Sequence, residues 1–248
     1  MNRLSVIQYM GEIKTDPYVH AFGELPNNLL SELTENWPDR DITVHGKSGD
    51  NVLIQYQAKE SLEENKINPI WKEFIEYHTS QEFIDDLFAW CPYFDERLKQ
   101  ISHNSGIRWR DDAYIKTDAM FCIDTPVVGN PVVKRMHLDN PKEFYKFLLR
   151  FPGGDYDTQG FLQIGKWKDG RKFSFQVKQK EHKYLCHPKS FDVVATNPNV
   201  GIYFYLNSSD SLHGISGREP NKRYRRYFNI VGHSFVKIWE IPKLTNQK

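Results

Sequence analysis

The sequence has few cysteines, no long apolar run and almost no net charge, and each scarcity excludes a class of protein. Cys91, Cys122 and Cys186 are odd in number, lie far apart and show none of the paired spacings of zinc sites. We therefore expect reduced, mostly buried thiols rather than a disulfide framework. No segment approaches the length of a membrane span, and residues 1–16 lack the pattern of a signal peptide, so a cytoplasmic location without a membrane partner is predicted.

The near balance of charge bears on partners. Lys and Arg number 33 against 32 Asp and Glu, a formal net charge of +1, so no overall field would attract nucleic acid or an anionic membrane, and neither is expected as a partner. Aromatic residues make up 14% of the chain and charged residues 26%, which is ordinary for a globular protein. With no repeat and no clear linker, we expect one domain over residues 1–248.

Two regions of that domain differ in pattern. Residues 1–115 are predicted to form a mixed, mainly helical support region. Asn27, Asn68 and Ser80 can each cap a run whose apolar residues recur on one face of a helix. We expect those apolar faces to pack on a sheet.

Residues 116–241 instead carry short aromatic or β-branched runs separated by turn-forming residues. Many short strands without intervening helices favour an antiparallel sandwich or barrel. The fold class predicted is therefore mainly β with N-terminal helices. A basic segment, residues 166–189, is interpreted as a solvated excursion from the sheet. The predicted strands are residues 119–123, 132–137, 144–151, 161–167, 173–179, 191–195, 201–206, 224–231 and 235–241.

His137 and Asp139 close one of these strands. Residues two apart in an extended segment point to the same side, so the imidazole and the carboxylate can meet at one point as two metal ligands. Another strand begins at His213, and Gly214 beside it permits close approach. Two histidines and one carboxylate form the facial set that suits non-haem Fe(II) activating dioxygen. The alternative is a turn-capping Asp139 and two histidines that only hold the sheet together.

The strand after His213 carries several arginines, and an arginine there can pair with the carboxylate of an organic acid. Arg226 shares a strand face with Phe228 and Ile230, which favours Arg226 as the residue that faces the site. Arg225 lies on the opposite face, which is predicted to meet solvent or a partner. Arg223 and Arg225 remain alternatives to Arg226, and a solvated basic strand end remains an alternative to all three.

Two stretches resemble the 2-oxoglutarate and Fe(II)-dependent oxygenases, in particular prolyl hydroxylase-like and phytanoyl-CoA hydroxylase-like members. These stretches are KRMHLDNPKEFYKFLLRFPGGDYDTQGFLQIGKW and NVGIYFYLNSSDSLHGISGREPNKRYRRYFNIVG, and the resemblance covers roughly residues 116–241. It implies a double-stranded β-helix, or jelly roll, braced by helices.

The same resemblance implies iron ligands at His137, Asp139 and His213, and a 2-oxoglutarate anchor at Arg226 or at one of its alternatives. The cofactor would be Fe(II), and the cosubstrates 2-oxoglutarate and O2. The expected reaction is hydroxylation with release of succinate and CO2, with no catalytic residue beyond the metal ligands. In many relatives the basic residue lies nearer to the distal histidine, at the spacing of Arg223.

The sequence is also compatible with two other functions. One is a non-enzymatic jelly-roll binding module, in which His137 and His213 are structural. The other is a cupin-like metalloenzyme that uses the same ligands without 2-oxoglutarate. The substrate is expected to be a small molecule or a peptide. Its identity does not follow from the sequence, because substrate contacts sit on variable loops, and neither does the oligomeric state.

Overall fold

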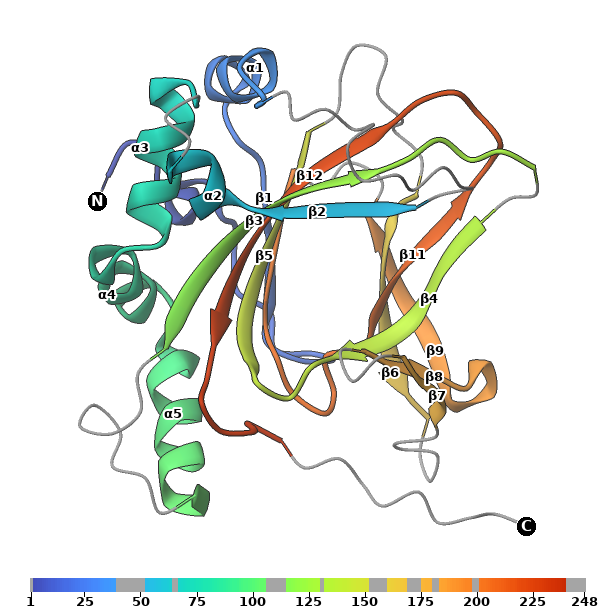
Figure 1. The fold of residues 1–248 in the computed structure, drawn as a ribbon. Helices are drawn as coiled ribbons and strands as arrows, with labels where there is room; N and C mark the ends of the chain where they lie inside the picture. The colour runs from blue at the N-terminus through green and yellow to red at the C-terminus, as the bar shows by residue number, and fades with distance from the viewer. Residues whose placement is uncertain are drawn as a thin grey trace.

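Two antiparallel sheets face each other, and helices cover the outer side of one of them (Figure 1). The structure is a computed structural model of the 248-residue chain. It describes residues 2–38, 52–63, 67–105, 115–129, 132–151, 160–168, 175–179, 183–197 and 201–239. The predicted jelly roll braced by N-terminal helices is confirmed.

The sheet that carries the helices, called the major sheet, has the strand order β1-β10-β5-β12-β3-β2. The opposing minor sheet has the order β7-β8-β4-β11-β6-β9. The major strands are β1 (His20–Gly23), β2 (Leu53–Gln57), β3 (Lys116–Asp124), β5 (Glu143–Phe151), β10 (Ile202–Leu206) and β12 (Arg225–His233). The minor strands are β4 (Val132–Asp139), β6 (Leu162–Trp167), β7 (Phe175–Gln179), β8 (Lys183–Cys186), β9 (Phe191–Asn197) and β11 (His213–Arg218).

The helices are α1 (Asn27–Glu35), α2 (Ala58–Glu63), α3 (Pro69–His78), α4 (Gln81–Trp90) and α5 (Pro92–Ser105). Two of the predicted caps are confirmed. The Asn68 side chain accepts a hydrogen bond from the Ile70 N–H at 3.0 Å, and the Ser80 hydroxyl accepts one from Phe83 at 3.3 Å. α1 begins one residue earlier than predicted, so Asn27 is its first helical residue and not its cap.

Aromatic packing fixes the helices on the major sheet. Trp71 and Phe74 of α3 are fully buried, and the Trp71 ring centroid lies 4.8 Å from that of Phe121 and 5.1 Å from that of Phe228. Aromatic pairs at such distances add about 0.5–1.5 kcal/mol each beyond the area that they bury. This layer therefore holds one face of the major sheet and leaves the other face to the minor sheet.

Besides the helices, residues 1–115 supply the two edge strands β1 and β2 of the major sheet. Two predicted features differ from the structure. Residues 166–189 are not only a solvated excursion, because β7 and β8 extend the minor sheet and β8 pairs with the end of β4. Residues 235–239 form bends rather than the predicted strand, and residues 240–241 lie outside the described residues.

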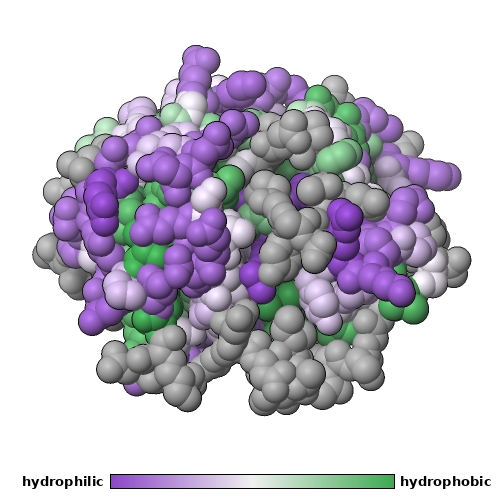
Figure 2. All heavy atoms as spheres, turned by 90° about the horizontal axis from the view of Figure 1, so that it is seen from above, coloured by the Kyte–Doolittle hydropathy of each residue, from purple (hydrophilic) through white to green (hydrophobic). Residues whose placement is uncertain are grey.

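The cysteine prediction is confirmed, since all three thiols are free and buried. No helix in the described part of the chain is both long and apolar enough to cross a membrane. Seen from above, the surface is mainly hydrophilic, and the hydrophobic side chains of the described residues form several small patches on that side (Figure 2).

Candidate metal centre and adjoining cavity

The structure brings His137, Asp139 and His213 together between the two sheets. His137 and Asp139 point to the same side of β4, and His213 on β11 lies directly opposite His137 in the strand register. Such opposed residues have Cβ atoms about 4.5–5.5 Å apart, which explains the meeting of the two imidazoles. One potential ligand atom from each residue lies within 4.8 Å of the others, and all three side chains are buried.

Hydrogen bonds to the backbone orient both imidazoles. His137 Nδ1 lies 2.8 Å from the Arg135 carbonyl oxygen, and His213 Nδ1 lies 2.9 Å from that of Ser211. Because a carbonyl oxygen only accepts, each Nδ1 carries a hydrogen and donates it. Each Nε2 then directs a lone pair toward Asp139, as metal-ligating histidines do.

The charges of the cluster agree with a cation site. Burial, reinforced by the neighbouring His137, lowers the pKa of His213 to about 3, so this imidazole is neutral at physiological pH. Its Nε2 lies 3.6 Å from Asp139 Oδ2, and His137 Nε2 lies 3.4 Å from Oδ1. Two imidazole nitrogens and one carboxylate oxygen form the donor set that non-haem Fe(II) takes with open positions. The residues therefore fit a divalent iron.

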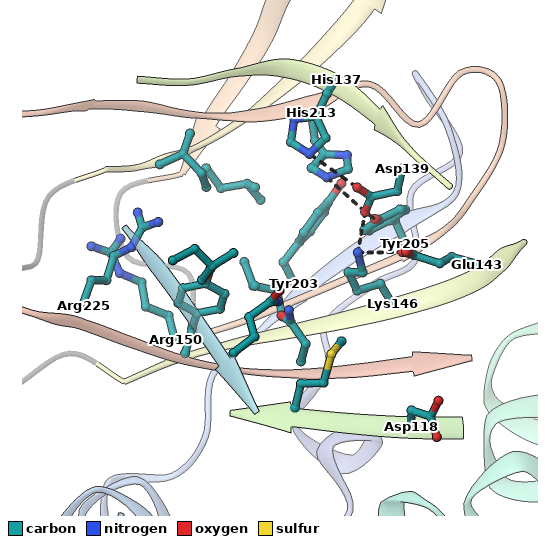
Figure 3. A pocket seen from close by; sticks show the side chains of 18 of the residues that line it. Asp118, His137, Asp139, Glu143, Lys146, Arg150, Tyr203, Tyr205, His213 and Arg225 are labelled. Atoms are coloured by element: carbon teal, nitrogen blue, oxygen red, sulfur yellow. Dashed lines mark hydrogen bonds and ion pairs between the residues drawn. The ribbon is translucent and has the colours of Figure 1, made fainter. Parts of the chain in front are cut away.

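Asp139 also contacts two residues that the sequence did not mark as part of the site. Its Oδ2 accepts hydrogen bonds from the Tyr205 hydroxyl and from Lys146 Nζ, and Lys146 also binds Glu143 at 2.7 Å (Figure 3). Burial lowers the pKa of Lys146, but the carboxylates of Asp139 and Glu143 outweigh burial and raise it above its usual value. The ammonium group therefore stays charged inside the protein.

A cavity of about 430 Å³ adjoins this cluster, and its opposite end is basic. Figure 3 shows Arg150 and Arg225 together at that end, away from the two histidines. Arg225 is buried, donates through Nε and Nη2 to the fully buried Asp124, and donates through Nη1 to the Gly160 carbonyl oxygen at 3.4 Å. Since Arg150 adds a second guanidinium, this end suits an anion.

The arginine expected in the cavity was the wrong one. The Arg226 guanidinium lies over the Trp37 ring at 5.4 Å, on the helix side of the major sheet, and Arg223 is exposed in the turn before β12. The face predicted to meet solvent, which carries Arg225 and Asn229, is buried and lines the cavity. The period-two alternation was correct, but the side assigned to each face was reversed.

The strand register places the two ends of the cavity. On β5, Arg150 lies opposite Tyr227, while Lys146, at the metal end, lies opposite Tyr205 of β10. Arg150 lies four positions after Lys146 on β5, so their Cα atoms are about 13 Å apart along the strand. The cavity therefore runs along the strands from the metal cluster to the arginines.

A third part of the cavity wall is formed by β2, β3 and β12. Gln55 and Gln57 on the edge strand β2 are exposed, while Asn229 on β12 is only 6% exposed. The Asn229 amide nitrogen donates to the Cys122 sulfur at 3.5 Å, but its Oδ1 is buried and accepts no hydrogen bond from any described residue. A buried acceptor of this kind is costly unless a ligand or water donates to it.

A sequence signal for Lys146 and Arg150 did exist. They lie four residues apart, and so on one face, in a strand whose opposite face is apolar. Tyr205 had a weaker signal, because the five residues of β10 are all buried and nothing in their pattern marks one hydroxyl as different.

The similarities of this chain to known proteins are structural and remote. No protein-family model and no curated protein matches the chain. Solved structures similar to it include HygX from Streptomyces hygroscopicus with nickel and 2-oxoglutarate bound, at 12% identity and a TM-score of 0.46, covering 97% of this chain and 90% of HygX. A prolyl 4-hydroxylase from Phytophthora capsici is similar at 13% identity and a TM-score of 0.45. That match covers 87% of this chain but 59% of the hydroxylase, so the chain spans less than two thirds of its length.

The epimerase SnoN, in complex with Fe3+, alpha-ketoglutarate and nogalamycin RO, is similar at 11% identity and a TM-score of 0.42, covering 87% of this chain and 78% of SnoN. Similar solved structures are thus prolyl 4-hydroxylases and other 2-oxoglutarate-Fe(II) oxygenases, at low identity.

Proposed function

We propose that the protein is an Fe(II)- and 2-oxoglutarate-dependent dioxygenase that hydroxylates a small-molecule or peptidyl substrate. The observation that carries the proposal is the convergence of His137, Asp139 and His213, with both imidazoles oriented by backbone carbonyls, at one end of a cavity. The basic opposite end of the same cavity supports a second anionic ligand beside the metal.

The metal ligands in this proposal are His137 Nε2, Asp139 and His213 Nε2. Iron bound there, with 2-oxoglutarate and O2, supplies the oxidising chemistry that hydroxylates a substrate and converts 2-oxoglutarate into succinate and CO2. The protein contributes an open ligand set, a buried site and fixed ligand orientations. We place this activity in the cytoplasm as part of the proposal, since three free thiols and ferrous iron both suit a reducing compartment.

Arg225 is the residue proposed to bind the distal carboxylate of 2-oxoglutarate, with help from Arg150. Arg225 takes this role in place of Arg226, because only Arg225 lines the cavity. Arg225 is held by Asp124, and Arg150 brings a second guanidinium to the same end of the cavity, where a carboxylate can accept from both. The bond from Arg225 to the Gly160 carbonyl fixes the direction of the side chain.

The prime substrate is proposed to lie against the β2, β3 and β12 wall. There Asn229 Oδ1 offers a buried acceptor, and Gln55 and Gln57 offer further polar groups toward solvent. A substrate that donates an N–H or O–H to Asn229 would satisfy that acceptor.

Anaerobic calorimetry with Fe(II) or Mn(II), followed by a succinate assay with 2-oxoglutarate, tests the proposal. His137→Ala and His213→Ala should each reduce metal affinity by more than about 100-fold, since even outer-shell changes cost 10–100-fold. Metal binding without any effect of 2-oxoglutarate would favour the cupin-like enzyme, and absence of metal binding would favour the binding module. A mass increase of one oxygen in a cell extract incubated with the loaded enzyme would identify the substrate.

A further inference from the structure

We propose that Lys146 and Tyr205 are positioning residues that occupy one oxygen of Asp139, so that this carboxylate binds the metal through its other oxygen alone. This inference rests on the proposed function, because it concerns the same metal site. It gives a role to two polar side chains that lie inside the protein and are not metal ligands themselves (Figure 3).

Both hydrogen bonds that Asp139 accepts from Lys146 and Tyr205 go to the same carboxylate oxygen. A carboxylate oxygen offers about two lone-pair sites, and Oδ2 already accepts from Lys146 Nζ and from the Tyr205 hydroxyl. Oδ2 is therefore saturated by donors. Oδ1 lies 3.4 Å from His137 Nε2 and Oδ2 lies 3.6 Å from His213 Nε2, and neither imidazole donates to Asp139, because the hydrogen of each is on Nδ1. Oδ1 is thus the oxygen left to the metal.

Both donors are held in place by further contacts. Lys146 is bound to Glu143 at 2.7 Å, and its side chain is 13% exposed. It lies directly opposite Tyr205 in the pairing of β5 with β10. The Tyr205 ring stacks on Tyr203 at 5.3 Å and lies 4.9 Å from the His213 ring. A ligand fixed by donors that are themselves fixed keeps one orientation.

The number of open coordination positions follows from this arrangement. Three residues that each bind an octahedral ion through one atom leave three coordination positions open. A carboxylate bound through both oxygens would take a fourth position and leave two. If the proposed function holds, 2-oxoglutarate and O2 would need these open positions, and a saturated Oδ2 would keep Asp139 from taking one of them.

The experiment compares Tyr205→Phe with Tyr203→Phe. The two tyrosines lie two residues apart on β10, and both are 1% exposed. Only Tyr205 donates to Asp139, because the Tyr203 hydroxyl is paired with that of Tyr18 at 2.7 Å. Each variant is loaded with Co(II), whose visible spectrum reports coordination, and with Mn(II) for calorimetric titration with 2-oxoglutarate. Lys146→Met and the conservative Lys146→Arg complete the set.

We expect Tyr205→Phe to alter the cobalt spectrum and to weaken 2-oxoglutarate binding by the Mn(II) protein about tenfold or more. Tyr203→Phe should match the wild type in both measurements. Lys146→Met should behave as Tyr205→Phe does, and Lys146→Arg should restore the wild-type spectrum. If Lys146→Met does not fold, the tyrosine pair still decides the question.

Wild-type cobalt spectra in both Tyr205→Phe and Lys146→Met would overturn the inference, as would equal changes in Tyr203→Phe and Tyr205→Phe. Failure of the proposed function has a different signature and appears in the wild-type protein itself. A wild type that binds no Mn(II) overturns both proposals. A wild type that binds Mn(II) but not 2-oxoglutarate overturns the dioxygenase, while the cobalt spectra still decide the role of Lys146 and Tyr205.

Discussion

The two faces of the major sheet are formed by alternate residues of the same strands, and both are buried, yet they bury different chemistry. Toward the helices, β12 presents Phe228, which packs against Phe121 and Trp71. Toward the minor sheet, the same strand presents Arg225 and Asn229. Burial alone therefore does not distinguish a packing face from a binding face.

What distinguishes the faces is how their groups are satisfied. The helix face is held mainly by close packing of aromatic rings, and the polar atom of Trp71, its indole Nε1, donates to the Leu33 carbonyl oxygen at 2.9 Å. The cavity face needs a partner for every charge, and it has Asp124 for Arg225 and Glu143 with Asp139 for Lys146. A buried polar face of this kind is costly to form, which is the reason to interpret it as a site.

The largest expected effect concerns the ion pair on the cavity face. Asp124→Asn leaves the buried Arg225 guanidinium without a negative partner and should destabilise the fold by about 3–5 kcal/mol. Arg226→Met on the helix face removes a contact with Trp37 and should cost about 1 kcal/mol. Urea unfolding of both variants measures the difference, and equal costs would contradict the contrast between the faces.

The same pair of faces predicts which arginine matters for ligand binding. Arg225→Gln should weaken 2-oxoglutarate binding by about 30-fold or more, because loss of one partner of a buried charge pair costs about 2–5 kcal/mol. Arg226→Gln should leave the affinity unchanged. Calorimetry on Mn(II)-loaded protein with native circular dichroism measures both, and Arg150→Gln provides a second cavity variant. A large loss in Arg226→Gln alone would reverse the assignment.

The error over these arginines shows the limit of the sequence analysis. Alternation along β12 correctly grouped Arg226 with Phe228 and Arg225 with Asn229. The sequence alone does not show which face of β12 meets the helices and which meets the minor sheet. We assigned the apolar face, with Arg226, to the site. In a two-sheet fold with helices outside, the apolar face packs on the helices, so the polar face lines the cavity.

The metal cluster was predictable for a different reason. His137 and Asp139 are close in the sequence, and the family resemblance supplied His213. Lys146 and Tyr205 reach Asp139 only through the packing of the major sheet on the minor sheet, which local patterns do not encode. The hairpin of β7 and β8 was missed because its basic composition resembles a solvated loop, although β8 pairs with the residues of the ligand strand.

A smaller effect is expected at Gly160, which supports the basic end. Its φ of +77° lies in the left-handed region, and a Cβ there would lie 2.5 Å from Arg225 Nη1. Gly160→Ala should cost about 1–2 kcal/mol of stability and weaken 2-oxoglutarate binding by displacing Arg225. Mn(II) affinity should not change, because the metal end lies about 13 Å away along the strands. A loss of metal affinity would show that the two ends are not independent.

The smallest effect is the pH dependence of stability that comes from His78, a buried histidine on the helix side. On the helix side, burial lowers the pKa of His78 to about 3, and its ring is satisfied as a neutral group: Nδ1 donates to the Phe74 carbonyl at 2.7 Å, and Nε2 accepts from the Val6 N–H at 3.2 Å. The unfolded chain binds this proton with a pKa near 6.5, so the unfolded state gains protons first as the pH falls.

Stability from His78 is therefore fully present above pH 6.5 and is lost as the pH falls toward 3. The expected loss is about 1 kcal/mol between pH 6.5 and 5.5. His78→Gln, which retains a donor and an acceptor, should reduce that slope in urea unfolding measured at each pH with metal bound, whereas Arg226→Met should retain it. An unchanged slope in His78→Gln would show that the acid sensitivity arises elsewhere, for example at His20, whose pKa is also lowered by burial.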